Sequence, residues 1–172
     1  MKRGQCDLIY RDGTFYLSIS VDAPEPTPID PTGYLGVDLG IVNIATTSEG
    51  KSFSGKTINN ARARFSKFRA KLQSKGTKSA KRLLKKRRRK ERRFQTDVNH
   101  CISKAIVTRA KDIGKGIALE DLKHIRSRVT VRRGQRRVIH SWAFAQLRFF
   151  VEYKARLVGV PVILVDPRNT SR

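Results

Sequence analysis

Alternating apolar and polar residues at the start of the chain predict short strands. Residues 5–10 and 14–21 are rich in β-branched and aromatic side chains on either side of a turn that contains Gly13, a pattern typical of a β-hairpin. Residues 23–33 hold four prolines and therefore predict an extended linker. From Tyr34 the segments YLGVDLG, IVNIATT and KSFSG predict three further strands, joined as a meander.

Residues 59–113 change to helical spacing and predict two helices separated by the polar turn SKGTKS. The apolar positions that carry this prediction are Phe65, Phe68 and Leu72 in the first helix and Phe94, Val98, Ile102, Ala105 and Ile106 in the second. The spacing places each set on one face of its helix, which we expect to pack against other elements.

The last third of the chain predicts a strand, a basic loop, a helix and a final strand. GIALEDL at 116–122 is the first strand, and PVILVD at 161–166 reads as a buried one. Between them Ser141 is expected to cap a helix that ends at Gly159. Its apolar residues include Trp142, Leu147, Phe150 and Leu157.

The predicted order, β-β-β-α-β-α-β, follows the N-terminal hairpin and indicates an α/β fold. A meander followed by α/β crossovers matches the RNase H-like mixed sheet, with helices on its faces. Here the two helices of 59–113 form a basic insertion, and the helix that usually closes such a sheet is missing from the predicted elements.

The net charge of the chain indicates what kind of partner it binds. The 172 residues include 38 Lys and Arg against 14 Asp and Glu, a net charge of +24. A compact domain with this charge repels itself unless a polyanion is near, so nucleic acid is the expected partner.

A membrane is not expected, because no run approaches the roughly 18 apolar residues of a spanning helix. Cys6 and Cys101 lie far apart and predict reduced thiols. We expect a cytoplasmic protein of a prokaryotic cell, associated with the nucleoid.

The positive charge is concentrated between Arg62 and Arg93, where 17 Lys or Arg accompany the single acid Glu91. This density exceeds that of an ordinary solvated helix face, so we expect it to bind phosphate backbone without sequence choice. The candidate nucleic-acid-binding residues are Lys81, Arg82, Lys85, Lys86, Arg87, Arg88, Arg89, Lys90, Arg92 and Arg93 in the second helix and Arg132, Arg133, Arg136 and Arg137 in the basic loop. We expect the histidines and phenylalanines to be structural.

Asp38 is the first candidate for chemistry. Strand alternation in GVDLG, with Asp38 expected in mid-strand, puts Gly36, Asp38 and Gly40 on one face. The glycines would leave space above the carboxylate for a hydrated Mg²⁺ and a phosphate. The alternative is that the glycines mark a bulge or turn and that Asp38 is a surface charge.

Glu120 is the second candidate, because acids are disfavoured in buried strands unless they are paired or bound to a metal. If its strand pairs with the first, Glu120 can reach Asp38 across the sheet. Two carboxylates are the minimum for holding a divalent ion, and a two-metal site needs more ligands. Asp121 is expected to be a strand-end acid in solvent. Asp166 is a possible third ligand, although its place before Pro167 favours a turn.

A resemblance to a known family joins these features. GVDLGIVNIAT, the basic helical hairpin, IALEDL and the run from SWAFAQLRFF to VDPRNTSR resemble the TnpB/OrfB proteins of insertion-sequence transposons, relatives of type V CRISPR effectors. The resemblance covers residues 34–172. It implies a RuvC-type nuclease guided by RNA that cleaves DNA with Mg²⁺ (or Mn²⁺), with Asp38 as the first catalytic acid and Glu120 as the second, both metal ligands.

The resemblance also implies a domain organisation. Residues 1–33 would be the end of a preceding oligonucleotide-binding β-domain and residues 34–172 the RuvC core. In the family a third acid follows a four-cysteine zinc ribbon that begins just after the position of Ser171. We therefore expect zinc ribbon and last RuvC segment to be absent, and expect this chain alone to bind DNA and guide RNA but to cut poorly. Asp166 matches a non-catalytic position.

Two other functions remain open from the residues. A non-catalytic, basic nucleic-acid-binding module would explain the charge without any metal. An actin-like or sugar-kinase-like ATPase would explain GVDLGIVN as a phosphate-binding hairpin, but it needs a second glycine-rich loop and gives the basic helices no role.

Overall fold

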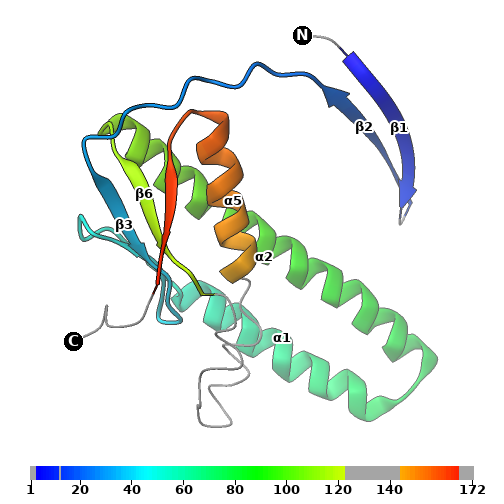
Figure 1. Ribbon diagram of the computed structural model, residues 1–172. Helices are drawn as coiled ribbons and strands as arrows, with labels where there is room; N and C mark the ends of the chain where they lie inside the picture. The colour runs from blue at the N-terminus through cyan, green and yellow to red at the C-terminus, as the bar shows by residue number, and fades with distance from the viewer. Residues whose placement is uncertain (1–2, 12, 123–143, 167–172) are drawn as a thin grey trace.

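The computed structural model describes residues 3–11, 13–122 and 144–166, and within them it contains two sheets and three helices. The chain order agrees with the predicted order (Figure 1). The elements are β1 (Arg3–Arg11), β2 (Thr14–Val21), β3 (Tyr34–Asp38), β4 (Asn43–Thr47), β5 (Ser52–Ser54), α1 (Lys56–Lys75), α2 (Lys78–Asp112), β6 (Gly116–Glu120), α5 (Phe144–Leu157) and β7 (Val162–Val165).

The larger sheet is mixed, with the strand order β5-β4-β3-β6-β7. The first three strands form the predicted antiparallel meander, and β6 and β7 then add in parallel through helical crossovers. In the parallel pair formed by β3 and β6, Gly36 lies opposite Ala118 and Val37 opposite Leu119. This register places the two candidate acids on neighbouring strands.

Helices α2 and α5 lie on the same face of the larger sheet (Figure 1). The core between them takes Val37 and Leu119 from the sheet, Ile106 from α2 and Val151 from α5, each at most 3% exposed. Every second residue of β3 points into this core, as the alternation predicts. Burying one such side chain contributes about 1.5–3 kcal/mol, so the pattern firmly fixes which sheet face is covered.

Helices α1 and α2 form an antiparallel pair that extends away from the sheet (Figure 1). The turn between them lies at Gly76 and Thr77, within the predicted SKGTKS segment. Thr77 begins α2, because its Oγ1 accepts a hydrogen bond from the backbone N of Ala80 at 3.2 Å. At 1.5 Å per residue, the 35 residues of α2 span about 50 Å. We call the distal part of this pair, residues 62–93, the basic arm.

Strands β1 and β2 form the predicted hairpin, which stands apart from the layers in Figure 1. Its described side chains are all exposed. The proline-rich linker is extended, and its second half runs along the core: the backbone N of Ile29 donates to the carbonyl O of Gly159 at 2.8 Å. Gly159 has φ +75°, and a Cβ there would lie 2.7 Å from the carbonyl O of Thr27. Glycine is therefore needed where α5 meets the linker.

Some details of the pattern were wrong. The final strand, predicted to be buried, leaves Ile163, Leu164 and Val165 at 39%, 40% and 38% exposed because β7 lies at the edge of the sheet. Leu157, one of the apolar residues on which the helix was predicted, is 63% exposed in the last turn of α5. The expectations for Ser141 and Trp142 fall outside the described residues.

Candidate functional site

Asp38 and Glu120 lie at the carboxyl ends of adjacent parallel strands. Asp38 is the last residue of β3, not a mid-strand residue, because the chain turns immediately afterwards toward β4. The pairing of Val37 with Leu119 places Asp38 and Glu120 one step further along, on the same side of the sheet. Since Val37 and Leu119 point into the helical core, the two acids point to the opposite face.

A hollow of about 330 Å³ lies on this open face, and both acids line it. Thr46, which pairs with Asp38 across β3 and β4, and Ala118 contribute small side chains to its wall. Val165 of β7 lines it as well. The small neighbours leave room beside the carboxylates, so the hollow can take an ion with its water ligands or a phosphate group. We call it the acidic hollow.

The two glycines beside Asp38 have different roles. A Cβ at Gly40 would lie 2.8 Å from the carbonyl O of Asn43, so Gly40 is required for the tight turn between β3 and β4. A Cβ at Gly36 would meet the Ser48 side chain at 3.5 Å, an ordinary contact. The turn interpretation is therefore correct for Gly40, while Gly36 lines the hollow together with small residues on the neighbouring strands.

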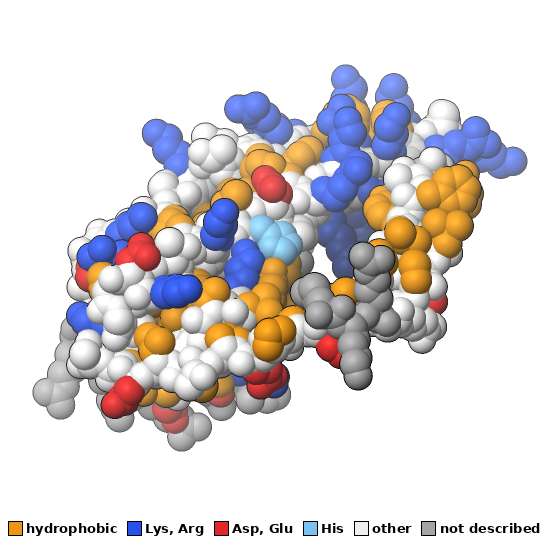
Figure 2. Space-filling model, turned by 90° about the horizontal axis from the view of Figure 1, so that it is seen from above, with side chains coloured by type: hydrophobic (Ala, Val, Ile, Leu, Met, Phe, Trp, Pro, Cys, Tyr) orange, Lys and Arg blue, Asp and Glu red, His pale blue; other side chains and the backbone are white. Residues whose placement is uncertain are grey.

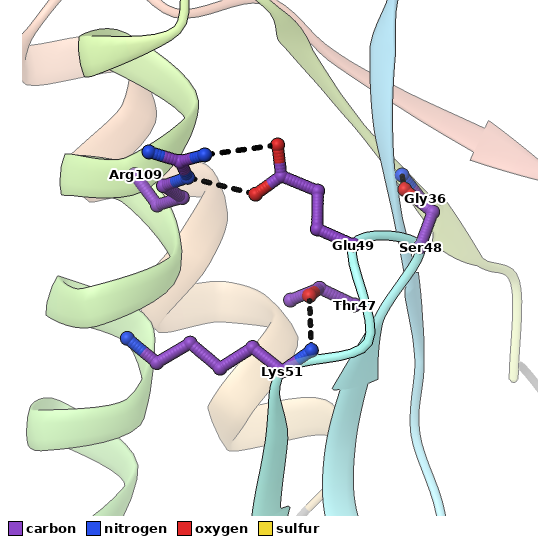
Figure 3. A network of polar contacts seen from close by, with 6 residues as sticks. All are labelled: Gly36, Thr47, Ser48, Glu49, Lys51 and Arg109. Carbon is purple, nitrogen blue, oxygen red and sulfur yellow. Dashed lines mark hydrogen bonds and ion pairs between the residues drawn. The ribbon is translucent and has the colours of Figure 1, made fainter.

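The turn between β4 and β5 is tied down on two sides (Figure 3). Glu49 accepts hydrogen bonds from Nε and Nη2 of Arg109 in α2, at 2.7 and 3.1 Å. The backbone N of Gly36 donates to Oγ of Ser48 at 3.2 Å. The hydrogen bond from Arg109 lowers the pKa of Glu49. This network places Ser48 on the rim of the acidic hollow.

Sequence reasoning missed the network of Glu49, Arg109 and Ser48. The residues are far apart in the chain, and the only sequence signal was the Ser-Glu-Gly turn itself. A bidentate pair between Arg and a carboxylate has a fixed geometry, so the turn is positioned more firmly than its polar sequence indicates.

The two remaining acids behave differently from the candidate pair. Asp121 was expected in solvent, but its Oδ1 accepts a hydrogen bond from Nη1 of Arg148 in α5 at 2.8 Å. It therefore holds the helix layer to the sheet. Asp166 follows β7, whose Val165 pairs with Glu120. Within the described residues, no group of three or more His, Cys, Asp and Glu side chains is arranged to hold a metal ion.

The basic arm presents its charge to solvent. All ten candidate residues between Lys81 and Arg93 are exposed, and Figure 2 shows Lys and Arg side chains gathered on the side of the molecule where the arm lies. Glu91, the single acid of the arm, accepts a hydrogen bond from Nη2 of Arg69 at 2.6 Å and so joins α1 to α2. The candidates Arg132, Arg133, Arg136 and Arg137 lie outside the described residues.

Among the described helices, none has the length and the apolar composition needed to cross a bilayer. His100 is structural as predicted, since its ring stacks on Phe150 with 3.9 Å between centroids. His124 and His140 fall in the part of the chain that is not described.

Comparison with known proteins agrees with this architecture. Residues 17–126 match the OrfB_IS605 family, described as a probable transposase. A TnpB-like protein of Methanocaldococcus jannaschii is 38% identical over 112 residues, covering 63% of this chain and 40% of that protein. The CRISPR-associated endodeoxyribonuclease Cas12f1 of Sulfoacidibacillus thermotolerans is 28% identical over 180 residues, covering 94% of this chain and 41% of that protein. The chain thus spans about two fifths of the length of these relatives.

Solved structures share the fold. The cryo-EM structure of a CRISPR-Cas12f ternary complex superposes with a TM-score of 0.65 at 19% identity, covering 91% of this chain and 33% of that one. The structure of a Cas12f1-sgRNA-target DNA complex gives a TM-score of 0.59 at 18% identity, covering 95% and 42%. These likenesses confirm the predicted RuvC-like α/β fold, and the sequence match covers most of the chain. The chain belongs to the OrfB_IS605 family of probable transposases, the TnpB/OrfB group that its motifs resemble.

Proposed function

We propose that this chain forms the nuclease core of a transposon-associated DNA endonuclease guided by RNA, in which Asp38 and Glu120 hold a Mg²⁺ or Mn²⁺ ion. One observation carries the proposal. Two carboxylates from adjacent parallel strands line one hollow on the sheet face that α2 and α5 leave open.

The residues of the acidic hollow fit a single hard cation. Mg²⁺ prefers oxygen ligands, keeps several water molecules and is usually bound by one or two carboxylates together with substrate phosphates. Asp38 and Glu120 supply the two carboxylates, and the volume of about 330 Å³ accommodates waters and a phosphate. When bound, such an ion lowers the pKa of a coordinated water and stabilises negative charge on the leaving oxygen.

The chain's own groups would orient the substrate around that ion. Asp38 and Glu120 fix the position of the ion relative to the sheet. Ser48, held against β3 by the backbone N of Gly36, offers a hydroxyl at the rim that can donate a hydrogen bond to a phosphate oxygen. The basic arm would bind the backbone of the nucleic acid outside the hollow, where each phosphate contact releases counterions.

The partners proposed here are DNA and a guide RNA. The support is the fold shared with Cas12f structures that were solved as an sgRNA-target DNA complex and as a ternary complex, together with the net charge of +24. Because the substrate is chromosomal or transposon DNA, we propose that the protein works in the cytoplasm at the nucleoid.

Isothermal titration of Mg²⁺ and of Mn²⁺ tests the metal site. We expect the wild-type chain to bind the ion with a stoichiometry near one, and the variants Asp38→Asn and Glu120→Gln, which keep side-chain shape, to lose most of that binding. Asp112→Asn is the matched control, because Asp112 is an exposed acid at the end of α2 that does not line the hollow. Equal heats from all four proteins would overturn the assignment of the site.

A second candidate is a nucleic-acid-binding module without a metal. It is favoured by the exposed basic arm and by the fact that, among the described residues, no three potential ligands cluster. The same titration separates the two functions. Retained DNA binding with no difference in metal binding between wild type and the Asp38→Asn variant would support the module.

A further inference from the structure

A second hollow lies where the basic arm joins the core. It has a volume of about 410 Å³, and the described residues that line it are Arg92, Arg93, Thr96, Asp97 and His100 of α2. These residues recur at intervals of three or four, so they share one face of the helix. Along α2 the two arginines come first, and His100 follows about two turns later, toward the core.

Aromatic rings continue from this hollow onto α5. The ring of His100 stacks on Phe150, with 3.9 Å between centroids and 18° between planes. The ring of Phe149 lies 6.1 Å from Phe150 and 5.6 Å from Tyr153, measured between centroids. Phe149 is 60% exposed, whereas Phe150 is 8% exposed. The prediction that the phenylalanines are core residues is therefore correct for Phe150 and wrong for Phe149.

Side-chain hydrogen bonds hold this aromatic surface in place. Nζ of Lys154 donates to the backbone O of His100 at 2.7 Å and to Oγ of Ser103 at 2.8 Å. Nε2 of Gln146 donates to Oγ1 of Thr96 at 3.2 Å, and Oε1 of Gln146 accepts from Asn99. Because α5 is bonded to α2 at Thr96 and at His100, little ordering of this part of the hollow is needed when a ligand binds.

The combination of cations and an exposed ring is suited to one nucleotide of an unpaired strand. A phosphate matches the donor geometry of Arg92 and Arg93, and an unpaired base has a free π-face that can stack on Phe149. The formal charge at the hollow is only +1, since Asp97 offsets one of the two arginines. A ligand that adds stacking is therefore favoured over a simple anion. A duplex hides its base faces and cannot use the ring.

We propose that this hollow, together with the ring of Phe149, is a subsite for a nucleotide of a single-stranded nucleic acid. Arg92 and Arg93 bind the phosphate and Phe149 stacks on the base. The inference rests on the nucleic-acid binding proposed above but not on the metal site. The subsite would distinguish single-stranded from double-stranded nucleic acid, whereas the rest of the basic arm would contribute only charge.

Binding of a short oligothymidylate and of a duplex with the same number of phosphates, both followed by fluorescence anisotropy, tests the subsite. Phe149→Ala should weaken single-strand binding by on the order of tenfold, as expected for loss of one stacked base, and leave duplex binding within about twofold. Phe149→Trp should restore single-strand binding, because it keeps a stacking face. Leu157→Ala is the control: it removes a 63% exposed apolar side chain from the same helix and should change neither affinity.

The phosphate contact has its own readout. Arg92→Gln/Arg93→Gln should reduce the slope of log affinity against log salt by about 0.7 for the single strand, because the two arginines bind one phosphate and each phosphate contributes roughly 0.7. It should also reduce the fluorescence change of a 2-aminopurine placed in the strand. Lys85→Gln/Lys86→Gln, further along the arm, should reduce the slope similarly but keep the 2-aminopurine response.

Several outcomes would overturn the subsite. Unchanged single-strand binding by Phe149→Ala would do so, as would an equal loss for single strand and duplex with circular dichroism unchanged. An equal 2-aminopurine loss in both double variants would show that the hollow has no special role. If the wild-type chain bound neither nucleic acid, the nucleic-acid binding of the proposed function would fail with it, whereas the metal titration would still stand.

Discussion

The two halves of α2 have the same backbone geometry but different surroundings. In the first half, Lys78 to Arg93, Ala80 is the one residue that the structure records as buried. The buried residues of the second half are Asn99, Ile102, Ser103, Ile106, Val107 and Ala110. The carboxyl half of this continuous helix is therefore fixed in the core, and its amino half extends from the core and carries positive charge.

Different interactions hold the two halves. The carboxyl half is stabilised by burial against the sheet and α5. The amino half has like charges at neighbouring positions on its faces, which destabilise an isolated helix. It depends on α1 for support, through the pair of Arg69 with Glu91 and through Arg87, whose guanidinium lies 4.6 Å from the ring centroid of Phe68. Burial between the helices lowers the pKa of Arg62, which lies where the arm begins.

The largest expected difference between the two halves is the loss of stability when an apolar side chain is truncated. Ile106 is 1% exposed and Leu83 is 38% exposed, although both are on α2. Ile106→Ala should lower the free energy of unfolding by about 2–5 kcal/mol, because it leaves a cavity in the core. Leu83→Ala should lower it by less than about 1 kcal/mol. Urea denaturation followed by circular dichroism gives both values.

Equal losses from the two substitutions would contradict the division of α2. Ile106→Val is a useful second variant, since it should cost only about 0.5–1.5 kcal/mol and leave a folded protein even where the alanine variant unfolds.

Removing positive charge should affect nucleic-acid binding more in the amino half of α2 than in the carboxyl half. Lys85→Gln/Arg88→Gln takes two charges from the amino half, and Lys104→Gln/Lys111→Gln takes two exposed charges from the carboxyl half. If the arm contacts phosphates and the core half does not, the first pair should reduce the duplex salt slope by about 1.8, at roughly 0.9 per contact. The second pair should leave it unchanged. Titrations of a duplex at several salt concentrations measure the slopes.

A similar fall in slope from both pairs would mean that nucleic acid follows the whole length of α2. The two halves of α2 would then differ in burial but not in nucleic-acid binding.

The sequence predicted what depends on local spacing. The alternation of Val37 and Asp38 gave the two faces of β3, and the helical spacing of Ile102 and Ile106 gave the buried side of α2. These are properties of a single element, so short-range patterns carry them. The placement of Asp38 near Glu120 required strand order, which the predicted β/α sequence supplied.

What the sequence did not predict depends on which element ends up beside which. The apolar run of β7 looks buried, but the exposure of Ile163 follows from its place at the edge of the sheet. Phe149 and Phe150 are neighbours of the same type, and only the direction of α5 decides which one faces solvent. The bond between Glu49 and Arg109 joins residues 60 positions apart, a separation at which no local pattern exists.

The smallest expected effect concerns that bond, which ties the carboxyl half of α2 to the turn beside the acidic hollow. Arg109 lowers the pKa of Glu49 below 4.5, so Glu49 binds its proton less readily in the folded chain than in the unfolded chain. The resulting stabilisation is complete above pH 4.5 and is lost as pH falls through the lower folded pKa.

Glu49→Gln should therefore be slightly less stable than wild type near neutral pH and should lose less stability on acidification. Thermal melts across the acid range measure the difference, with Glu25→Gln as the control, since Glu25 pairs with Arg156 on the linker side and is 71% exposed. If Glu49→Gln followed the wild-type acid profile, the turn would be held by Ser48 and the backbone alone.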